Sequence, residues 1–431
     1  MKKKLHRFER LGEQYIEAQH ESGLKIMICP KPDFTSSYAL FGTRYGSTDT
    51  LFRLQGEEEF STIPEGTAHF LEHKLFESEE GDAFDRFSKT GGAANAYTSF
   101  DRTCYLFSCS DRFDENLDIL LDFVRHPYFT EQTVQKEQGI IGQEIRMYDD
   151  DPGWSVSFNL LKALYHCHPV RIDIAGTVES IAEINAEVLY NCYRTFYNPA
   201  NMFLCVCGPV DPDAILKKVE EVFAGAESKP IERGVHDEPR SIVTDRVETK
   251  MAVALPLFCF GYKEDCTASP EKTLRERMET NILLEMIGGR SSRLYNELIE
   301  QGLINDAFDA SYFTGFGYAA EMFEGESKEP EKVAAAIKGE IERIRKEGID
   351  PSEFARAKNS LYGRNVMMYN SVERVASALT SAVIEGYCLY DIVDVFDSIT
   401  LADLQKRINE QFDPAYCALS VVYPADSQIQ D

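Results

Sequence analysis

The chain carries the same succession of strand-like and helix-like patterns twice, on either side of a polar segment at residues 225–241. This segment contains two prolines and shows no hydrophobic periodicity, which is typical of a linker. On both sides, runs rich in β-forming residues lead into helical patterns without the regular alternation that a parallel sheet requires. Residues 129–134 align with residues 349–354, at an offset of 220. We therefore predict an α+β protein built from two copies of one unit.

The length agrees with this division, because 431 residues are enough for two or three domains of roughly 150 residues. We place an N-terminal domain at residues 1–228 and a linker at residues 229–241. The C-terminal copy then occupies residues 242–431.

The composition excludes several classes of protein. The net charge of −27 repels the phosphates of nucleic acid and favours basic peptides as partners. No apolar run reaches the roughly 18 residues of a membrane span, and the basic first residues lack the apolar core of a signal peptide. Eleven cysteines without a CxxC pair indicate reduced thiols. We therefore expect a cytoplasmic protein that binds neither nucleic acid nor membrane.

The segment GTAHFLEHKLFE carries the strongest chemical signal. Pro64 and Gly66 precede a helix predicted from about Thr67 to Glu77, and at 100° per residue His69, Glu72 and His73 share one side of it. Two imidazoles at i and i+4 can bind one ion, and H-x-x-E-H is the inverted form of a zinc-peptidase motif. The alternative is a solvated helix face with two exposed histidines.

A second helix, predicted at residues 130–148, presents two glutamates on one face, because Glu137 and Glu144 are seven residues apart. A catalytic zinc ion takes three protein ligands and keeps one open position. With two histidines already available, Glu144 is the candidate third ligand.

With these residues the chain resembles the pitrilysin/insulinase family of zinc peptidases, which includes the mitochondrial processing peptidase. The resemblance extends from about residue 20 to residue 425 and is most specific in the N-terminal half. Its local amino-acid sequence is most similar to that of the zinc-bearing subunits of short bacterial members. Further matching blocks are His168-Pro169, Gly176-Thr177 and Tyr197-Asn198-Pro199-Ala200-Asn201-Met202.

The resemblance implies a role for each part of the site. It implies one Zn²⁺ per chain, held by His69, His73 and Glu144. Glu72 would act as the general base, and Glu137 would support the site, unless it is an ordinary exposed helix glutamate. It also implies that Asn95, Ala96, Tyr97 and Thr98 form a substrate-binding edge strand. The alternative is an ordinary core strand.

The resemblance also implies an overall architecture. Each of the two domains would have an antiparallel sheet of about six strands with helices packed on one face. The two domains would form a clam shell that closes around a peptide.

The sequence departs from the family pattern in its C-terminal half. Active members place an arginine there, followed seven residues later by a tyrosine that stabilises the oxyanion. This chain has Leu298 and Asn305 at those positions, and no histidine after His236. Either a partner subunit of the same fold supplies the pair, giving a heterodimer (or a homodimer), or Arg290 or Arg293 substitutes. The competing hypothesis is a structural subunit without activity.

The weaker motifs favour structural interpretations. His166-Cys167-His168 is more typical of a helix end than of a metal site, and Cys205 and Cys207 alternate on a predicted core strand. GGRSSR lacks the Lys-Ser/Thr pair that ends a phosphate-binding loop, and the G-x-S-x-G motif of many serine hydrolases is absent.

Overall fold

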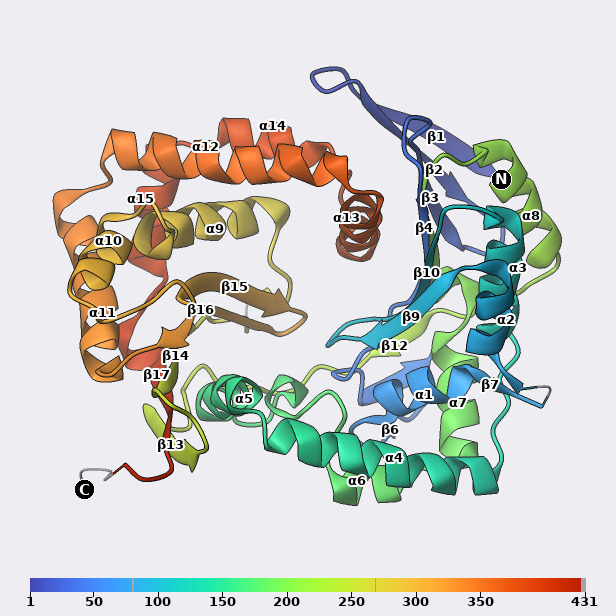
Figure 1. Ribbon diagram of the computed structural model, residues 1–431, viewed down its shortest axis with the longest axis horizontal. Coiled ribbons are helices and arrows are strands. Elements are labelled where there is room, and N and C mark those ends of the chain that lie inside the picture. The colour runs from blue at the N-terminus through green and yellow to red at the C-terminus, as the bar shows by residue number, and fades with distance from the viewer. Residues whose placement is uncertain (80, 268, 428–431) are drawn as a thin grey trace. The chain divides into compact units, whose positions relative to one another are not determined.

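The computed structural model describes residues 1–427 except 80 and 268, and it divides into two compact units (Figure 1). Unit 1 consists of residues 1–145, 173–234 and 367–391, and unit 2 of residues 146–172, 235–366 and 392 onward. Each unit combines one main β-sheet with helices, which confirms the predicted α+β class. The units are not the contiguous domains expected at 1–228 and 242–431, because residues 146–172 belong to unit 2 and residues 367–391 to unit 1.

Unit 1 is built on a sheet of seven strands among the described residues. Neighbouring strands are antiparallel except for β3 and β11, which are parallel. In spatial order the strands are β1 (Lys2–Phe8), β2 (Glu13–Gln19), β3 (Lys25–Pro30), β11 (Met202–Gly208), β4 (Ser37–Thr43), β10 (Thr103–Cys109) and β9 (Ala93–Thr98). Short strands pair beside it: β5 (Leu51–Leu54), β6 (Ser61–Thr62), β7 (Glu77–Ser78), β8 (Gly81–Asp82) and β12 (Ile231–Arg233).

The helices of unit 1 cover both faces of this sheet. They are α1 (Thr67–Leu75), α2 (Ala83–Thr90), α3 (Phe113–Phe123), most of α4 (Glu131–Asp149), α6 (Val178–Ala182), α7 (Ala186–Phe196), α8 (Pro212–Val222), α13 (Val372–Glu385), η2 (Pro199–Asn201) and η3 (Met368–Asn370).

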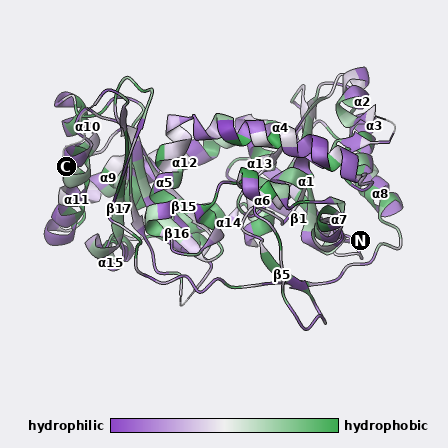
Figure 2. Cartoon of the chain, turned by 90° about the horizontal axis from the view of Figure 1, so that it is seen from below, coloured by the Kyte–Doolittle hydropathy of each residue, from purple (hydrophilic) through white to green (hydrophobic). Residues whose placement is uncertain are grey.

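Unit 2 has a sheet of five strands among the described residues, with one parallel pair, β13 and β17. In spatial order they are β13 (Arg246–Met251), β17 (Cys417–Pro424), β14 (Leu257–Lys263), β16 (Tyr318–Glu326) and β15 (Asp309–Gly315). The helices are α5 (Pro152–Leu164), α9 (Leu274–Gly288), α10 (Arg293–Glu300), α11 (Pro330–Glu347), α12 (Pro351–Met367), α14 (Asp391–Ser398), α15 (Leu401–Glu410), η1 (Pro169–Arg171) and η4 (Pro414–Tyr416). In Figure 2 the strand β17 is largely hydrophobic, and six of its eight residues are buried.

The two units repeat one topology. The spatial order β3-β11-β4-β10-β9 in unit 1 matches β13-β17-β14-β16-β15 in unit 2, with the parallel pair at the same place. Helix α4 begins at Glu131 and α12 at Pro351, which preserves the sequence offset of 220 residues. The predicted duplication is therefore visible in the fold.

Two details of the prediction are wrong. The sheets have seven and five strands among the described residues, which agrees with about six, but each contains a parallel pair. Helices also cover both faces of each sheet, since every residue of β4 and β11 in unit 1 and residues 258–263 of β14 in unit 2 are buried. Helix α13 packs on β4 and β11, and α5 packs on β14 and β17. A Cβ atom at Gly261 would lie 2.9 Å from a methyl carbon of Leu160, so glycine permits the close approach of α5.

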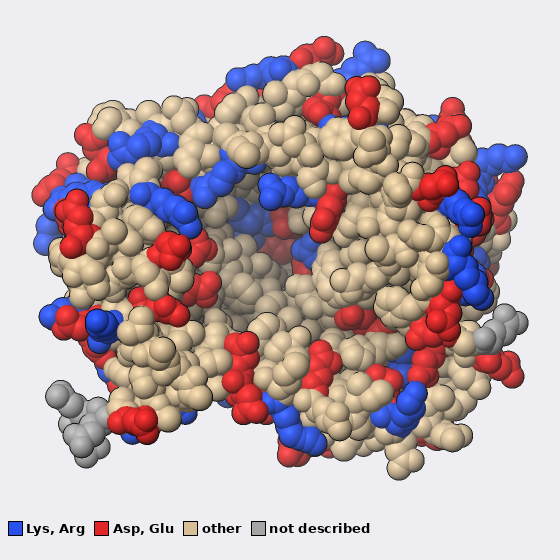
Figure 3. Space-filling model, in the orientation of Figure 1, with Lys and Arg blue, Asp and Glu red and all other residues tan. Residues whose placement is uncertain are grey.

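Several smaller expectations can be compared with the fold. Cys205 and Cys207 are fully buried, as predicted for core residues. The predicted linker is anchored at its N-terminal part, because Ile231–Arg233 pairs with β5. No helix in the described part of the chain is both long and apolar enough to cross a membrane. Figure 3 shows acidic and basic side chains interspersed over the visible face. The preference for basic peptides as partners stays a prediction.

A buried carboxyl group in unit 2 makes stability depend on pH. Glu321 on β16 is fully buried, with the carboxyl group of Glu264 beside it. Burial, with the charge of Glu264 added, raises the pKa of Glu321 well above its ordinary value of 4.5. The folded protein therefore holds a proton that the unfolded chain releases, and raising the pH above 4.5 destabilises the fold.

We predict that Glu321→Gln, which cannot ionise, raises the unfolding temperature at about pH 8 by more than about 2 °C relative to the unsubstituted protein. At about pH 5 the difference should shrink, because the carboxyl group is then protonated in most of the folded molecules. Thermal unfolding at both pH values checks this, with the exposed Glu300→Gln as control. An equal effect at both pH values would contradict the prediction.

Candidate metal centre

A glycine fixes the start of the helix that carries the motif. Gly66 has a left-handed φ of 85°, and a Cβ atom there would lie 2.3 Å from the carbonyl oxygen of Ala175. Only glycine tolerates both conditions. Helix α1 then begins at Thr67, as predicted, and its apolar side is buried in the core of unit 1 by Ala68, Phe70, Leu71 and Leu75.

The opposite side of α1 faces α4, which brings the three predicted ligands together. Nε2 of His69 lies 3.6 Å from Oε1 of Glu144, and Nε2 of His73 lies 3.5 Å from Oε2 of the same carboxylate. One ligand atom from each residue lies within 4.8 Å of the other two. Among the described residues, this is the one group of three histidine, cysteine or acidic side chains with such spacing.

The donor set fits a zinc ion. Tetrahedral zinc with bonds of about 2.0–2.1 Å separates neighbouring ligand atoms by roughly 3.3 Å, close to the separations between Glu144 and the two imidazoles. Burial, with the charge of His73 added, lowers the pKa of His69 to about 3. His69 is therefore neutral at physiological pH, as a metal ligand must be.

Glu137 holds the second histidine. Its Oε1 lies 3.0 Å from Nδ1 of His73, and the side chain is buried, so it is not an exposed helix glutamate. Burial lowers the pKa of His73, but the hydrogen bond to Glu137 and the charges of Glu144 and Glu72 outweigh burial and leave the pKa above its ordinary value. With its proton on Nδ1, His73 directs Nε2 toward Glu144.

Glu72 lies beside the ligands without belonging to their group. It is 9% exposed, and the hydroxyl of Thr98 donates a hydrogen bond of 2.5 Å to its Oε2. Burial raises the pKa of Glu72 against the lowering effects of Thr98 and His73, and the charge of Glu144 adds to the rise. Glu72 is therefore a carboxylate with increased affinity for a proton, as a general base requires.

The predicted substrate strand forms part of β9, at the edge of the unit 1 sheet. Asn95 and Tyr97 are exposed, whereas Ala96 and Thr98 are half-buried, and the exposed fraction of Tyr97 is 36%. This alternation excludes a core strand. The sequence suggested Thr98 only as a strand residue, and its bond to Glu72 joins positions 26 residues apart that no motif connects.

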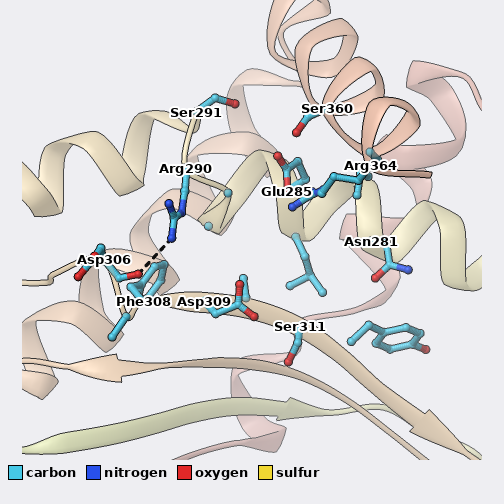
Figure 4. A pocket seen from close by; sticks show the side chains of 17 residues that line it. Asn281, Glu285, Arg290, Ser291, Asp306, Phe308, Asp309, Ser311, Ser360 and Arg364 are labelled. Atoms are coloured by element: carbon cyan, nitrogen blue, oxygen red, sulfur yellow. Dashed lines mark hydrogen bonds and ion pairs between the residues drawn. The ribbon is translucent and has the colours of Figure 1, made fainter. Parts of the chain in front are cut away.

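The C-terminal positions that depart from the family pattern all lie in unit 2. Leu298 is 1% exposed within the hydrophobic core, and the amide of Asn305 donates to Glu326 at 2.7 Å. Arg293 bonds to Glu297 on its own helix, and Arg290 donates to the carbonyl of Asp306 (Figure 4). The structure therefore gives Leu298 a packing role.

The cluster His166-Cys167-His168 is structural, as predicted. The carboxylate of Glu238 accepts hydrogen bonds from the backbone N–H groups of all three residues at 2.8–2.9 Å. His168 also caps η1 by accepting a hydrogen bond from the N–H of Val170.

Two sequence profiles match the chain. The profile described as Insulinase (Peptidase family M16) matches residues 61–178, and that described as Peptidase M16 inactive domain matches residues 183–361. A Bacillus subtilis protein named uncharacterized zinc protease YmfH is 41% identical over 408 residues, covering 94% of this chain and 95% of the relative.

Solved structures share the fold. The crystal structure of an M16-like peptidase from Alicyclobacillus acidocaldarius superposes with a TM-score of 0.92 at 35% identity, covering 96% of this chain and 99% of that one. Pitrilysin has the same fold with a TM-score of 0.75 at 17% identity, over 99% of this chain and 46% of the pitrilysin chain.

Proposed function

This chain belongs to peptidase family M16, the insulinase family, and from that membership we propose that it is a zinc-dependent endopeptidase. The observation that carries the proposal is the convergence of His69, His73 and Glu144 with Glu72 beside them. These three ligands would hold one zinc ion per chain. Bound there, zinc would lower the pKa of its water to about 7 and polarise the scissile carbonyl.

The chain's own residues then supply the proton transfers. Glu72 takes the proton of the attacking water and later gives it to the leaving amine. Thr98 holds Glu72 in place by its hydrogen bond, and Glu137 holds the ring of His73. The acid–base role therefore belongs to Glu72, and Glu137 is a positioning residue.

The substrate is an extended peptide that adds a strand to the edge of β9, along Asn95, Ala96, Tyr97 and Thr98. Main-chain hydrogen bonds would supply affinity, and pockets for alternate side chains would supply specificity. The bond from Thr98 to Glu72 supports this placement, because a peptide on β9 runs beside the general base.

A test of the positioning role follows from the contact between Glu137 and His73. We expect Glu137→Ala to weaken zinc binding and to lower kcat/KM by about 10–100-fold, since the imidazole loses its orientation. Chelator competition and peptide cleavage measure the two effects. Gln135→Ala, exposed on the same helix, is the control. Unchanged zinc affinity would show that Glu137 has no such role.

A partner subunit of the same fold completes the site in this proposal. Leu298 packs in a core, so it cannot substitute for the arginine of active members. One missing oxyanion donor costs about 10²–10³ in rate. A homodimer would carry Leu298 and Asn305 twice, which favours a heterodimer whose second chain has the arginine and tyrosine.

The second candidate function is a structural subunit, which the missing arginine and tyrosine favour. Zinc analysis and cleavage of a quenched fluorescent peptide library separate the two functions, with and without a same-fold partner. We expect one zinc per chain and cleavage that the partner increases. Absence of stoichiometric zinc, or zinc binding without cleavage in either sample, would favour the structural subunit.

A further inference from the structure

A cysteine, a histidine and a glutamate meet in unit 1, at the edge of the sheet opposite β9 (Figure 1). Sγ of Cys388 lies 3.1 Å from Nδ1 of His6, and Nε2 of the same ring lies 2.8 Å from Oε2 of Glu17. His6 is on β1, Glu17 is on β2, and Cys388 follows helix α13. The proposed peptidase chemistry uses none of the three. A nucleophile in contact with a base that a third group orients is the arrangement of an activated nucleophile.

The hairpin of β1 and β2 places these side chains on one face of the sheet. His6 and Tyr15 are directly opposite in the strand register, and their rings stack with centroids 4.6 Å apart. Glu17 lies two residues after Tyr15, so its side chain points to the same face. Tyr390, in the segment after α13, packs on Tyr15 and holds this segment against the hairpin. Burial raises the pKa of Tyr390 and of Tyr369 on η3, so both phenols stay neutral beside the site.

The hydrogen bonds show where the protons lie. A carboxylate only accepts hydrogen bonds, so Nε2 of His6 donates to Glu17, and Nδ1 is left to accept from the Cys388 thiol. The Tyr15 hydroxyl accepts from the N–H of Leu389 at 3.3 Å and donates to Sγ at 3.2 Å. Burial, with the hydrogen bond to Cys388 added, raises the pKa of Tyr15, so this hydroxyl keeps its proton. Transfer of the thiol proton to Nδ1 therefore leaves a thiolate with two hydrogen-bond donors, beside an imidazolium that a carboxylate stabilises.

The two other described cysteines that are not buried have different surroundings. Cys167 is exposed, and its Sγ donates to the carbonyl oxygen of Asp237, which does not take up the proton. Burial, with the side chain of Glu238 added, raises the pKa of Cys167. Burial likewise raises the pKa of the half-buried Cys266 to about 11. The thiolate is the reactive form of cysteine, so exposure favours Cys167 as the most reactive thiol, whereas the hydrogen bonds favour Cys388.

We propose that Cys388, His6 and Glu17 form a thiol modification site, at which a low-molecular-weight disulfide converts Cys388 to a mixed disulfide. Sγ gives its proton to Nδ1 of His6 and attacks one sulfur of the disulfide. A bond forms between Sγ and that sulfur, the disulfide's own S–S bond breaks, and the departing thiolate takes the proton from His6. One disulfide bond replaces another, so the step needs no further oxidant. Glu17 is a positioning residue, because it holds the ring with Nδ1 toward the sulfur.

The rate of modification of the folded, freshly reduced protein tests the proposal at about pH 7. The probe is bis(hydroxyethyl) disulfide, which is small and uncharged, and mass spectrometry of acid-quenched samples locates the modified cysteines. An ordinary thiol is only a few per cent ionised at this pH, so we expect Cys388 to react about tenfold faster than the more exposed Cys167. His6→Gln, which has no base to take the proton, should slow the reaction of Cys388 about tenfold. Raising the pH to about 9 should restore its rate, because the thiol then ionises without a base.

The control is Arg7→Gln, since Arg7 is exposed on β1 and points to the other face of the sheet. Its Cys388 should react at the rate of the unsubstituted protein. Glu17→Gln keeps an acceptor for Nε2 without the charge, so it should slow the reaction less, by about threefold, with the same recovery at high pH. This second variant decides the matter if His6→Gln does not fold. Modification of Cys388 no faster than that of Cys167, or a rate that neither substitution changes, would overturn the proposal.

Discussion

Replacing Glu72 with glutamine should abolish peptide hydrolysis and leave the metal content unchanged. Glutamine has nearly the same shape and can still accept the hydrogen bond from Thr98, but it cannot take a proton from water. General acid–base catalysis contributes about 10²–10⁴-fold, so we expect kcat to fall by at least about 10². Cleavage of a quenched fluorescent peptide and zinc analysis of the same preparation measure both quantities.

The matched control for this variant is Glu79→Gln, because Glu79 is exposed a few residues beyond α1. It should retain full activity. Glu72→Gln with unaltered kcat would remove Glu72 from the chemistry. A fall in activity with an equal fall in zinc content would instead assign Glu72 to metal binding.

Replacing Glu144 with alanine should remove both the zinc and the activity. Its two carboxylate oxygens face the two imidazoles at 3.5–3.6 Å, so its loss leaves two ligands instead of the three that a catalytic zinc requires. We expect the zinc affinity to fall by more than about 100-fold. Even the loss of a residue that only supports a metal ligand lowers metal affinity by about 10–100-fold. Chelator competition and peptide cleavage check this.

Gln143→Ala is the control, because Gln143 precedes Glu144 on α4 and is exposed. This variant should bind zinc and cleave peptides normally. If Glu144→Ala kept both properties, the ligand set would be wrong, even though the structure brings the three side chains together.

The two substitutions separate the two kinds of glutamate at this site. Glu72→Gln should yield a zinc-bound, inactive protein, and Glu144→Ala a zinc-free, inactive one. The zinc affinity and the activity of Glu137→Ala should lie between those of Glu144→Ala and those of the unsubstituted protein. The predicted order follows from contacts, since Glu144 faces both imidazoles and Glu137 only one.

The sequence by itself determined the local features of this protein. Helical periodicity placed His69, Glu72 and His73 on one side of α1, and the seven-residue spacing placed Glu137 and Glu144 on one face of α4. The offset of 220 residues indicated a repeated unit, which both sheets display. Such features depend on residues near one another in the chain, so spacing and side-chain type are enough to predict them.

Tertiary structure alone decided how distant segments meet. The hydrogen bond of Thr98 to Glu72 and the packing of α13 and α5 on the sheet of the other half left no local pattern in the sequence. Each depends on the burial of apolar faces between segments far apart in the chain, and the amino-acid pattern shows that a face is apolar but not which surface will cover it.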